Sequence, residues 1–217
     1  MNKFLAIAVA GFTLAAASQA SAASTSNNSN TFGPTKTDFT SATLTLQPFN
    51  TALGTLTGVS LTFNANATVS GSVTNNAPTA QNFKVTTDTQ VTMSSTTGSV
   101  NNVVVDLQST QSYTALAAGG TASYGPFAPG NSTTVSGTPL SDYTSGPINF
   151  TASTLSAITI LGGGNNIGTL INSTASGFAT VTYTYTPTPP TTVPEPASMA
   201  LLGMGLAGLG LIRRRSV

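Results

Sequence analysis

A long run of two-residue periodicity in the first half of the chain constrains its fold more than any other feature. In residues 59–74, apolar residues or glycine hold the odd positions, and Ser, Thr or Asn hold all the even ones. Because side chains along a β-strand point alternately to its two faces, this pattern predicts a half-buried antiparallel strand. A bend near residues 64–66 would instead divide the run into two strands, and the sequence leaves both arrangements open.

The same alternation recurs along the middle of the chain. It is seen in Leu44 and Leu46; in Phe83, Val85, Val91 and Met93; in Val103, Val105 and Leu107; in Ile148, Phe150 and Ala152; in Ile158 and Ile160; and in Val181, Tyr183 and Tyr185. Turns rich in Gly, Pro and Asn separate these runs, and no segment has a helical apolar stripe. The sequence therefore predicts an all-β domain over residues 23–185, an antiparallel β-sandwich with one face of each sheet in the core.

Charged and reactive side chains are scarce. Only 5% of the residues are charged, whereas an ordinary soluble domain has about 25%. Between the two ends, two lysines, Lys36 and Lys84, stand against four aspartates, so the body offers no basic face for nucleic acid. The chain has no Cys and no His, which excludes disulfides, thiolate metal sites and a histidine base. We therefore expect no enzymatic activity and no cofactor.

The N-terminus has the pattern of a secretory signal peptide. Lys3 stands in a short basic region, an apolar run covers residues 4–17, and the small residues Ala20 and Ala22 form a signal peptidase site. The apolar run is shorter than the roughly 20 residues that a transmembrane helix needs. We therefore expect residues 1–22 to be removed on export, which leaves Ala23 at the mature N-terminus.

The C-terminus has three parts in order. A Pro/Thr linker over residues 186–192 precedes the motif Val193, Pro194, Glu195 and Pro196. An apolar segment over residues 197–212 follows, and then come Arg213, Arg214 and Arg215. A helix over this segment would be about 24 Å long, slightly short of the roughly 30 Å hydrocarbon core, and the arginines can extend its reach. The positive end should stay in the cytoplasm, and the prolines keep the motif extended, as a processing enzyme requires.

These tail residues resemble the PEP-CTERM sorting signal of Gram-negative bacteria over residues 193–217. The resemblance implies that the helix holds the protein briefly in the inner membrane. It further implies cleavage near Glu195 by an exosortase, a membrane transpeptidase, and release to the cell surface or into extracellular matrix.

The body resembles the exported bacterial proteins named for a choice-of-anchor E domain. The resemblance rests on Leu-Gln-Pro-Phe-Asn at residues 46–50, Leu-Gly-Thr-Leu-Thr-Gly-Val at 53–59, and Val-Thr-Tyr-Thr-Tyr at 181–185. We interpret the first two motifs as a turn that leads into a strand, with Gly54 and Gly58 in conformations that other residues resist. The resemblance implies a surface domain joined to any of several anchors, and it assigns no activity.

Two kinds of ligand site remain open in the body. We expect Asp38 and Asp88 to be solvated surface charges, while Asp106 and Asp142 could join backbone carbonyls around a calcium ion, although no EF-hand loop supports this. An expected loop region also holds four aromatic residues among Gly and Pro. Such rings either stack on sugars or anchor loops in the core. They are Tyr113, Tyr124, Phe127 and Tyr143.

Two functions are consistent with these features. The first is a non-enzymatic protein of the cell surface or of a biofilm or exopolysaccharide matrix. The second is a carbohydrate-binding module that acts on extracellular polysaccharide. The expected partners are signal peptidase, exosortase, the membrane for a limited time, and polysaccharide; nucleic acid is not expected.

Overall fold

The computed structural model describes residues 21–95, 100–189 and 203–206 of the chain. The chain divides into two units, one of which spans Ala22–Thr188 while the other comprises Met1–Ser21 and Pro189–Val217. In the second unit the structure describes Ser21, Pro189 and residues 203–206, and residues 203–206 are helical. The hydrophobic core of the described residues lies wholly within the first unit, which is therefore a self-contained domain.

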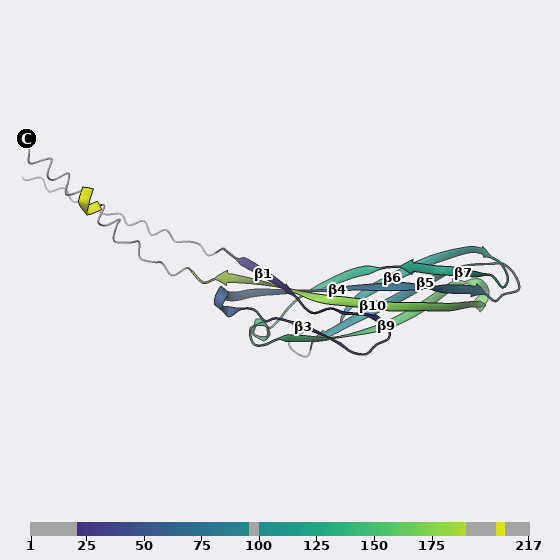
Figure 1. Cartoon of the computed structure of the whole chain (residues 1–217), viewed down its shortest axis with the longest axis horizontal. Helices are drawn as coiled ribbons and strands as arrows, with labels where there is room; N and C mark the ends of the chain where they lie inside the picture. Colours follow the sequence, from purple (N-terminus) through teal and green to yellow (C-terminus); the bar gives the residue numbers. More distant parts are fainter. Residues whose placement is uncertain (1–20, 96–99, 190–202, 207–217) are drawn as a thin grey trace, which may run out of the picture. The chain divides into compact units, whose positions relative to one another are not determined.

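The described strands of this domain form two sheets in which all pairs are antiparallel (Figure 1). The first sheet has the order β1-β10-β4-β7, with β2 also paired to β10 and β8 to β4. Its strands are β1 (Ala23–Asn28), β2 (Phe32–Lys36), β4 (Gly54–Asn75), β7 (Thr121–Phe127), β8 (Gly130–Ser136) and β10 (Ile167–Pro187). The second sheet has the order β3-β9-β5-β6. Its strands are β3 (Ala42–Leu46), β5 (Gln81–Ser95), β6 (Val103–Leu116) and β9 (Ile148–Gly162); the described 3₁₀ helices are η1 (Thr51–Leu53), η2 (Leu140–Tyr143) and η3 (Gly163–Asn165).

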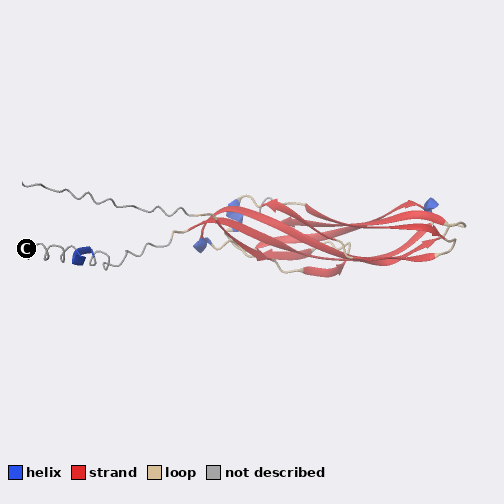
Figure 2. Ribbon diagram, turned by 90° about the horizontal axis from the view of Figure 1, so that it is seen from above, coloured by secondary structure: helices blue, strands red, loops and turns tan. Residues whose placement is uncertain are grey.

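The strand β4 is continuous, so the alternative of two strands joined by a bend near residues 64–66 is wrong. It pairs with β10 over its length, from Asn75 opposite Ile167 to Gly54 opposite Pro187. On its other side it pairs with β7 and β8. Figure 2 shows these long strands running lengthwise along the domain. The alternation of β4 holds from Val59 to Asn75 and shifts between Leu56 and Val59, opposite the irregularity between Thr184 and Tyr185 of β10.

One hydrophobic core lies between the two sheets. Phe63 of β4 meets Phe150 of β9 edge to face, with ring centroids 5.1 Å apart, and so joins the sheets. Two antiparallel sheets on one core fit the predicted β-sandwich. The apolar side chains of β4 that the sequence assigned to the core are all buried: Val59, Leu61, Phe63, Ala65, Ala67, Val69 and Val73.

The second half of β9 departs from the prediction. Ile158 and Ile160 continue the alternation of the buried residues Ile148 and Phe150, yet they are 46% and 36% exposed. The reason is topological, because the pairing of β3 with β9 ends at Ala152 and leaves the rest of this edge without that neighbour. Alternation shows which face a side chain occupies, but it does not show whether another element covers that face.

The junction between β4 and β10 also differs from expectation. Gly54 has a φ of 149°, and a Cβ there would overlap the carbonyl oxygen of Thr186, so the close approach of the two strands requires glycine. Gly58 is under no such constraint, since a Cβ there would first meet the Cβ of Thr184 at an ordinary 3.6 Å. β10 continues through Pro187, two residues into the segment 186–192 that the sequence assigned to a linker.

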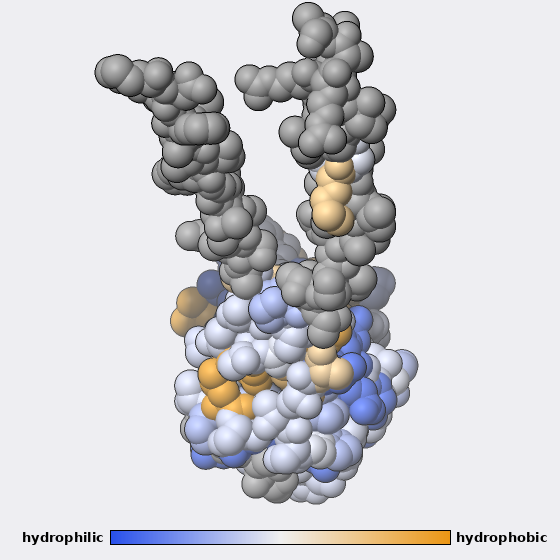
Figure 3. Space-filling model, turned by 90° about the vertical axis from the view of Figure 1, so that its left-hand side faces the viewer, coloured by the Kyte–Doolittle hydropathy of each residue, from blue (hydrophilic) through white to orange (hydrophobic). Residues whose placement is uncertain are grey.

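The domain surface is polar with little charge. Figure 3 views the end of the domain at which β1 begins, and the described surface there is mostly pale to blue with small orange areas. Hydroxyl pairs connect neighbouring strands on the outer faces: Thr62 to Thr134 at 2.9 Å and Thr86 to Thr110 at 3.0 Å. Cross-strand hydroxyl pairs of this kind stabilise a sheet without ion pairs.

Candidate functional site

One long side of the domain is only partly covered by the N-terminal strands. β1 and β2 pair with β10 at residues 180–185 and 174–177, and β3 pairs with β9 at residues 148–152. In the part of the chain that the structure describes, no strand pairs with the remainder of these two edges on this side. We call the region formed by residues 155–162 of β9 and 167–173 of β10 the open side.

Asp38 lies where the N-terminal segment crosses from β10 to β9. Its φ of 67° is left-handed, which an aspartate tolerates better than most residues. Oδ1 of Asp38 accepts a hydrogen bond from the backbone N–H of Ser156 at 2.7 Å, and its own N–H donates to Oγ1 of Thr154 at 2.9 Å. Asp38 is exposed, as the sequence predicts, but its carboxylate also holds the N-terminal segment against β9 at Ser156.

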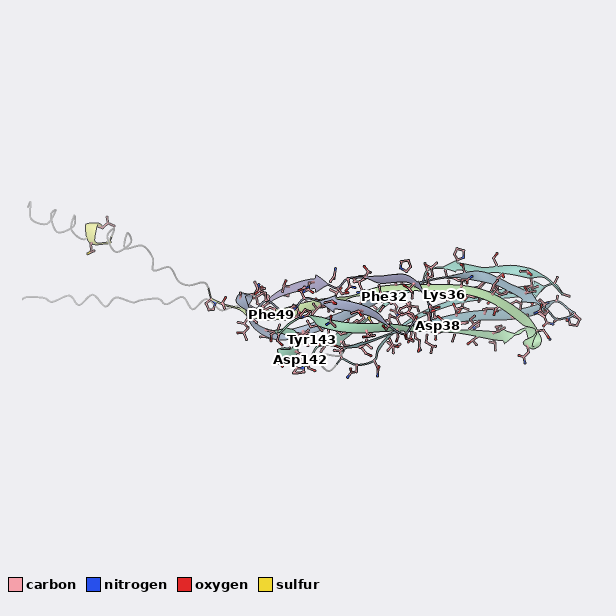
Figure 4. All side chains as sticks on the ribbon, turned by 60° about the horizontal axis from the view of Figure 1, so that its bottom comes forward. Phe32, Lys36, Asp38, Phe49, Asp142 and Tyr143 are labelled. Carbon is pink, nitrogen blue, oxygen red and sulfur yellow. The ribbon has the colours of Figure 1, made fainter. Side chains whose placement is uncertain are left out.

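A cavity of about 130 Å³ lies at this end of the open side. Thr89 Oγ1 of β5 lies 3.1 Å from Ser156 Oγ and 3.5 Å from Ser173 Oγ, so hydroxyls of three strands meet there. Figure 4 shows Lys36 and Asp38, the charged groups of its wall, near the middle of the domain. The wall holds one carboxylate, whereas glycoside hydrolysis requires two. The lining residues are Lys36, Thr37, Asp38, Thr87, Thr89, Ser156, Ala157, Ile158, Ile171 and Ser173.

Beyond this cavity the open side is apolar. Ile158 and Ile160 of β9 point into the space between the sheets but remain partly exposed, and Ile171 of β10 is half-buried opposite them. On the outer face of β9, Leu155 and Leu161 are 66% and 67% exposed. A concentration of apolar side chains at an uncovered sheet edge indicates an interaction surface more than a catalytic one.

The opposite long side of the domain is closed by side chains. Asn131 Nδ2 of β8 donates to the carbonyl oxygen of Asp106 on β6 at 3.0 Å. Thr133 Oγ1, also on β8, donates to the carbonyl oxygen of Val104 at 3.0 Å. These bonds connect the edges of the two sheets, so the two long sides of the domain differ.

The four aromatic residues proposed for sugar contact do not form a loop surface. Tyr113 lies in β6, Tyr124 and Phe127 lie in β7, and Tyr143 lies in η2. The three tyrosines are buried, and Phe127 is partly buried against Tyr124 with ring centroids 5.0 Å apart. A buried ring has no face free for a sugar, so the prediction is wrong for the tyrosines and leaves only Phe127 accessible.

The buried tyrosines instead connect elements of the core. Tyr124 Oη donates to the carbonyl oxygen of Ser109 at 3.0 Å, and Tyr183 Oη donates to that of Gln47 at 2.7 Å. Burial raises the pKa of Tyr113, Tyr143 and Tyr183 above the usual value, and the Asp142 carboxylate raises that of Tyr143 further. These groups are therefore neutral structural anchors at physiological pH.

The acidic residues do not gather into a metal site within the described residues, where no three of them come together. Figure 4 shows Asp38 near the middle of the domain and Asp142 nearer the end at which β1 begins. Asp106 lies on β6, where it pairs with Gln90 of β5. Asp88 is half-buried, and its Oδ1 is buried without a hydrogen-bond partner among the described residues. Its carboxylate is therefore only partly solvated, whereas the sequence predicts a solvated surface charge.

The residues expected to direct sorting and processing lie almost entirely outside the described residues. Ala22 is described, exposed, and directly precedes β1. Among the residues that the structure describes, no helix is long and apolar enough to cross a membrane. Most of the expected helix over residues 197–212 lies outside them. So do Ala20, Val193, Pro194, Glu195, Pro196, Arg213, Arg214 and Arg215.

Comparison with known proteins identifies the C-terminal signal. Residues 192–215 match the family model of the PEP-CTERM protein-sorting motif. This motif implies that the chain is an exported protein sorted by an exosortase. No curated protein matches the chain as a relative.

Solved structures similar to this chain come from infectious bursal disease virus. A chain of the Gx strain is 14% identical with a TM-score of 0.21, and the match covers 84% of this chain and 47% of that one. The VP2 subviral particle is 13% identical with a TM-score of 0.18, covering 86% of this chain and 49% of that one. The chain thus spans about half the length of these viral chains, and scores this low support no conclusion about fold or function.

Proposed function

We propose that this chain is a non-enzymatic protein of the cell surface or of an extracellular biofilm or exopolysaccharide matrix, delivered there by exosortase processing of its tail. The observation that carries the proposal is the PEP-CTERM match at residues 192–215. The order of the tail supports it. A proline-flanked motif at Glu195 precedes an apolar segment and three arginines, which suits cleavage on the outer side of a membrane.

The body suits a structural role. Its surface relies on hydroxyl pairs between strands, and its buried tyrosines are held neutral. The resemblance to choice-of-anchor E domains, carried by residues 46–50, 53–59 and 181–185, is part of this proposal, since such domains are exported and anchored in different ways. Binding of extracellular polysaccharide remains the alternative, but with Tyr113, Tyr124 and Tyr143 buried it would rest on other side chains. A glycan array with the purified domain tests this alternative directly.

The decisive experiment changes Glu195. In a host that makes the exosortase, Glu195→Ala should leave the apolar segment and the cytoplasmic arginines unchanged, so insertion and orientation should be normal. The variant should accumulate in the membrane with its tail uncut. Fractionation into membrane and medium, followed by mass measurement of the C-terminus, reads the outcome.

Two further variants make the comparison specific. Thr191 lies just before the matched motif, so the Thr191→Ala variant should be released like the unaltered protein. Replacing Arg213, Arg214 and Arg215 by neutral residues should disturb topology and retention instead of recognition. Normal release and tail removal in Glu195→Ala would show that the motif is an ordinary linker.

A further inference from the structure

We propose that the open side is a self-association surface, at which two copies of this chain pair edge to edge through β9 about a two-fold axis at Thr159. The inference goes beyond the sorting function and does not depend on it. It rests on the outward-facing backbone groups, the absence of charge and the residue order of residues 157–162.

The backbone of this part of β9 has hydrogen-bonding groups that face outward. Thr154 N–H donates to the carbonyl oxygen of Phe39, and Ser156 N–H donates to Asp38, so even-numbered residues of β9 direct their backbone away from β5. Because the direction of the backbone groups alternates along a strand, the N–H and C=O groups of Ile158 and Ile160 also point away from β5. Within the described residues no strand pairs with them on that side. This edge can therefore accept another strand.

Nothing in the local sequence protects the edge. Natural proteins block such edges with charges, prolines, bulges or a covering element. Residues 153–162 contain no charge and no proline, and no charged residue occurs anywhere from 143 to 188. A partner strand would therefore meet no charge on β9 or β10 themselves; the charged groups nearby are Lys36 and Asp38 at the cavity and Lys84 and Asp88 on the adjacent strand β5. The chemistry fits an uncharged, apolar strand, which this edge itself provides.

The residue order is self-complementary about Thr159. Antiparallel pairing centred there sets Ile158 opposite Ile160 of the second copy, and these residues can exchange both backbone hydrogen bonds. The same register sets the small Ala157 opposite the large, exposed Leu161 of the second copy. Both isoleucines would be shielded at the mouth of the sandwich, and Leu161 of each copy would gain Ala157 of the other as a neighbour. One two-fold operation thus covers most of the exposed apolar groups of β9.

The second sheet edge supports the same arrangement. The free part of β10 lies beside that of β9, because Ile158 and Ile171 line one cavity and Thr89 Oγ1 lies near hydroxyls of both strands. A two-fold axis perpendicular to the sheets brings the β10 edges of the two copies together as well. On the opposite long side, the bonds from Asn131 and Thr133 of β8 to the backbone of β6 occupy the corresponding space. Association should therefore stop at two copies.

The first test measures assembly of the domain spanning Ala22–Thr188, which contains the whole described core. Sedimentation velocity over a range of concentrations should show a monomer–dimer equilibrium. Ile158→Lys combined with Ile160→Lys places lysines opposite each other in the dimer and should raise its dissociation constant about ten-fold or more. Ile158→Lys combined with Ile160→Glu places opposite charges across the axis and should keep the dimer. Circular dichroism melts confirm that both variants fold.

The second test uses the full chain, which has no cysteine of its own. Residues facing each other at a position without mutual backbone hydrogen bonds have Cα atoms about 4.5 Å apart, close enough for a disulfide. Thr159→Cys should therefore form a covalent dimer under mild oxidation. Thr110→Cys, exposed on β6 of the closed side, is the matched control and should stay monomeric under the same conditions.

Each outcome decides the proposal. Dimerisation that is lost in the lysine pair, kept in the lysine–glutamate pair and trapped only by Thr159→Cys supports it. A domain that is monomeric at every concentration overturns it, as does equal cross-linking at Thr110→Cys. Equal behaviour of the two charge variants contradicts the register, and growth beyond two copies contradicts the closed two-fold arrangement. None of the altered residues lies in the tail, so these results stand or fall separately from the exosortase experiment.

Discussion

The architecture can be tested with one substitution made at two positions, Leu61→Ala and Leu170→Ala. Leu61 is fully buried in β4 between Val135 and Val181 on the adjacent strands, whereas Leu170 on β10 is 69% exposed. Each change removes three carbon atoms. At about 0.8 kcal/mol for each buried CH₂, the transfer loss at Leu61 is about 2.4 kcal/mol, and the cavity left behind brings the total to about 2.5 to 5 kcal/mol. At Leu170 only about a third of the transfer loss applies, about 0.7 kcal/mol, and no cavity forms.

The assay is equilibrium unfolding of the domain in urea. Far-ultraviolet circular dichroism is the suitable probe because the chain has no tryptophan. Protein concentration should be kept low, so that self-association does not add to the stability of the folded state. The slope of the free energy of unfolding against urea should be unchanged in both variants if both keep the same fold. A loss below about 1 kcal/mol for Leu61→Ala, or equal losses for the two variants, would refute the placement of β4 at the centre of a shared core.

Two further predictions concern the start of the mature chain and its response to alkali. N-terminal sequencing of the secreted protein should give Ala23, because Ala20 and Ala22 supply the small residues that signal peptidase needs; a chain still beginning at Met1 would contradict export. Burial raises the pKa of Tyr113, Tyr143 and Tyr183, so the stability that these neutral phenols contribute is fully present below about pH 10 and is lost as the pH rises above it. The urea midpoint should therefore fall above about pH 10, and Tyr183→Phe should lessen that fall; a midpoint independent of pH in this range would show that the phenols are not buried in solution.

Much of the fold could be predicted from the sequence because its strands are strongly periodic. The alternation in residues 59–73 marks the buried face of β4, and the turn-rich segments mark the limits of the strands. Pairing partners were beyond this reasoning, since period two carries no information on which strand lies beside which. The order β1-β10-β4-β7, in which strands from the two ends of the domain lie side by side, therefore had to come from the structure.

The candidate site shows the same limit at the level of single residues. Four aromatic side chains among glycines and prolines suggested loops, but Tyr113 lies in β6, and β7 includes Gly125 and Pro126 between Tyr124 and Phe127. Asp38 gave no signal beyond its nearness to Lys36. Its role depends on the hydrogen bond that its Oδ1 accepts from the N–H of Ser156, which lies 118 positions later in the chain. Local composition cannot reveal a contact over such a separation.

The open side shows that one apolar alternation along a strand can lead to burial in one half of the strand and to exposure in the other. Ile148, Phe150 and Ala152 continue into Ile158 and Ile160 without a change of period, yet the first three are buried and the last two are exposed. The difference comes from the N-terminal segment, which turns at Asp38 and covers only half of the edge. A chain with so few charges has little means of protecting the uncovered half by repulsion. Pairing with a second copy, as proposed above, would protect it, because the outward backbone groups and the exposed isoleucines would then have a neighbouring strand.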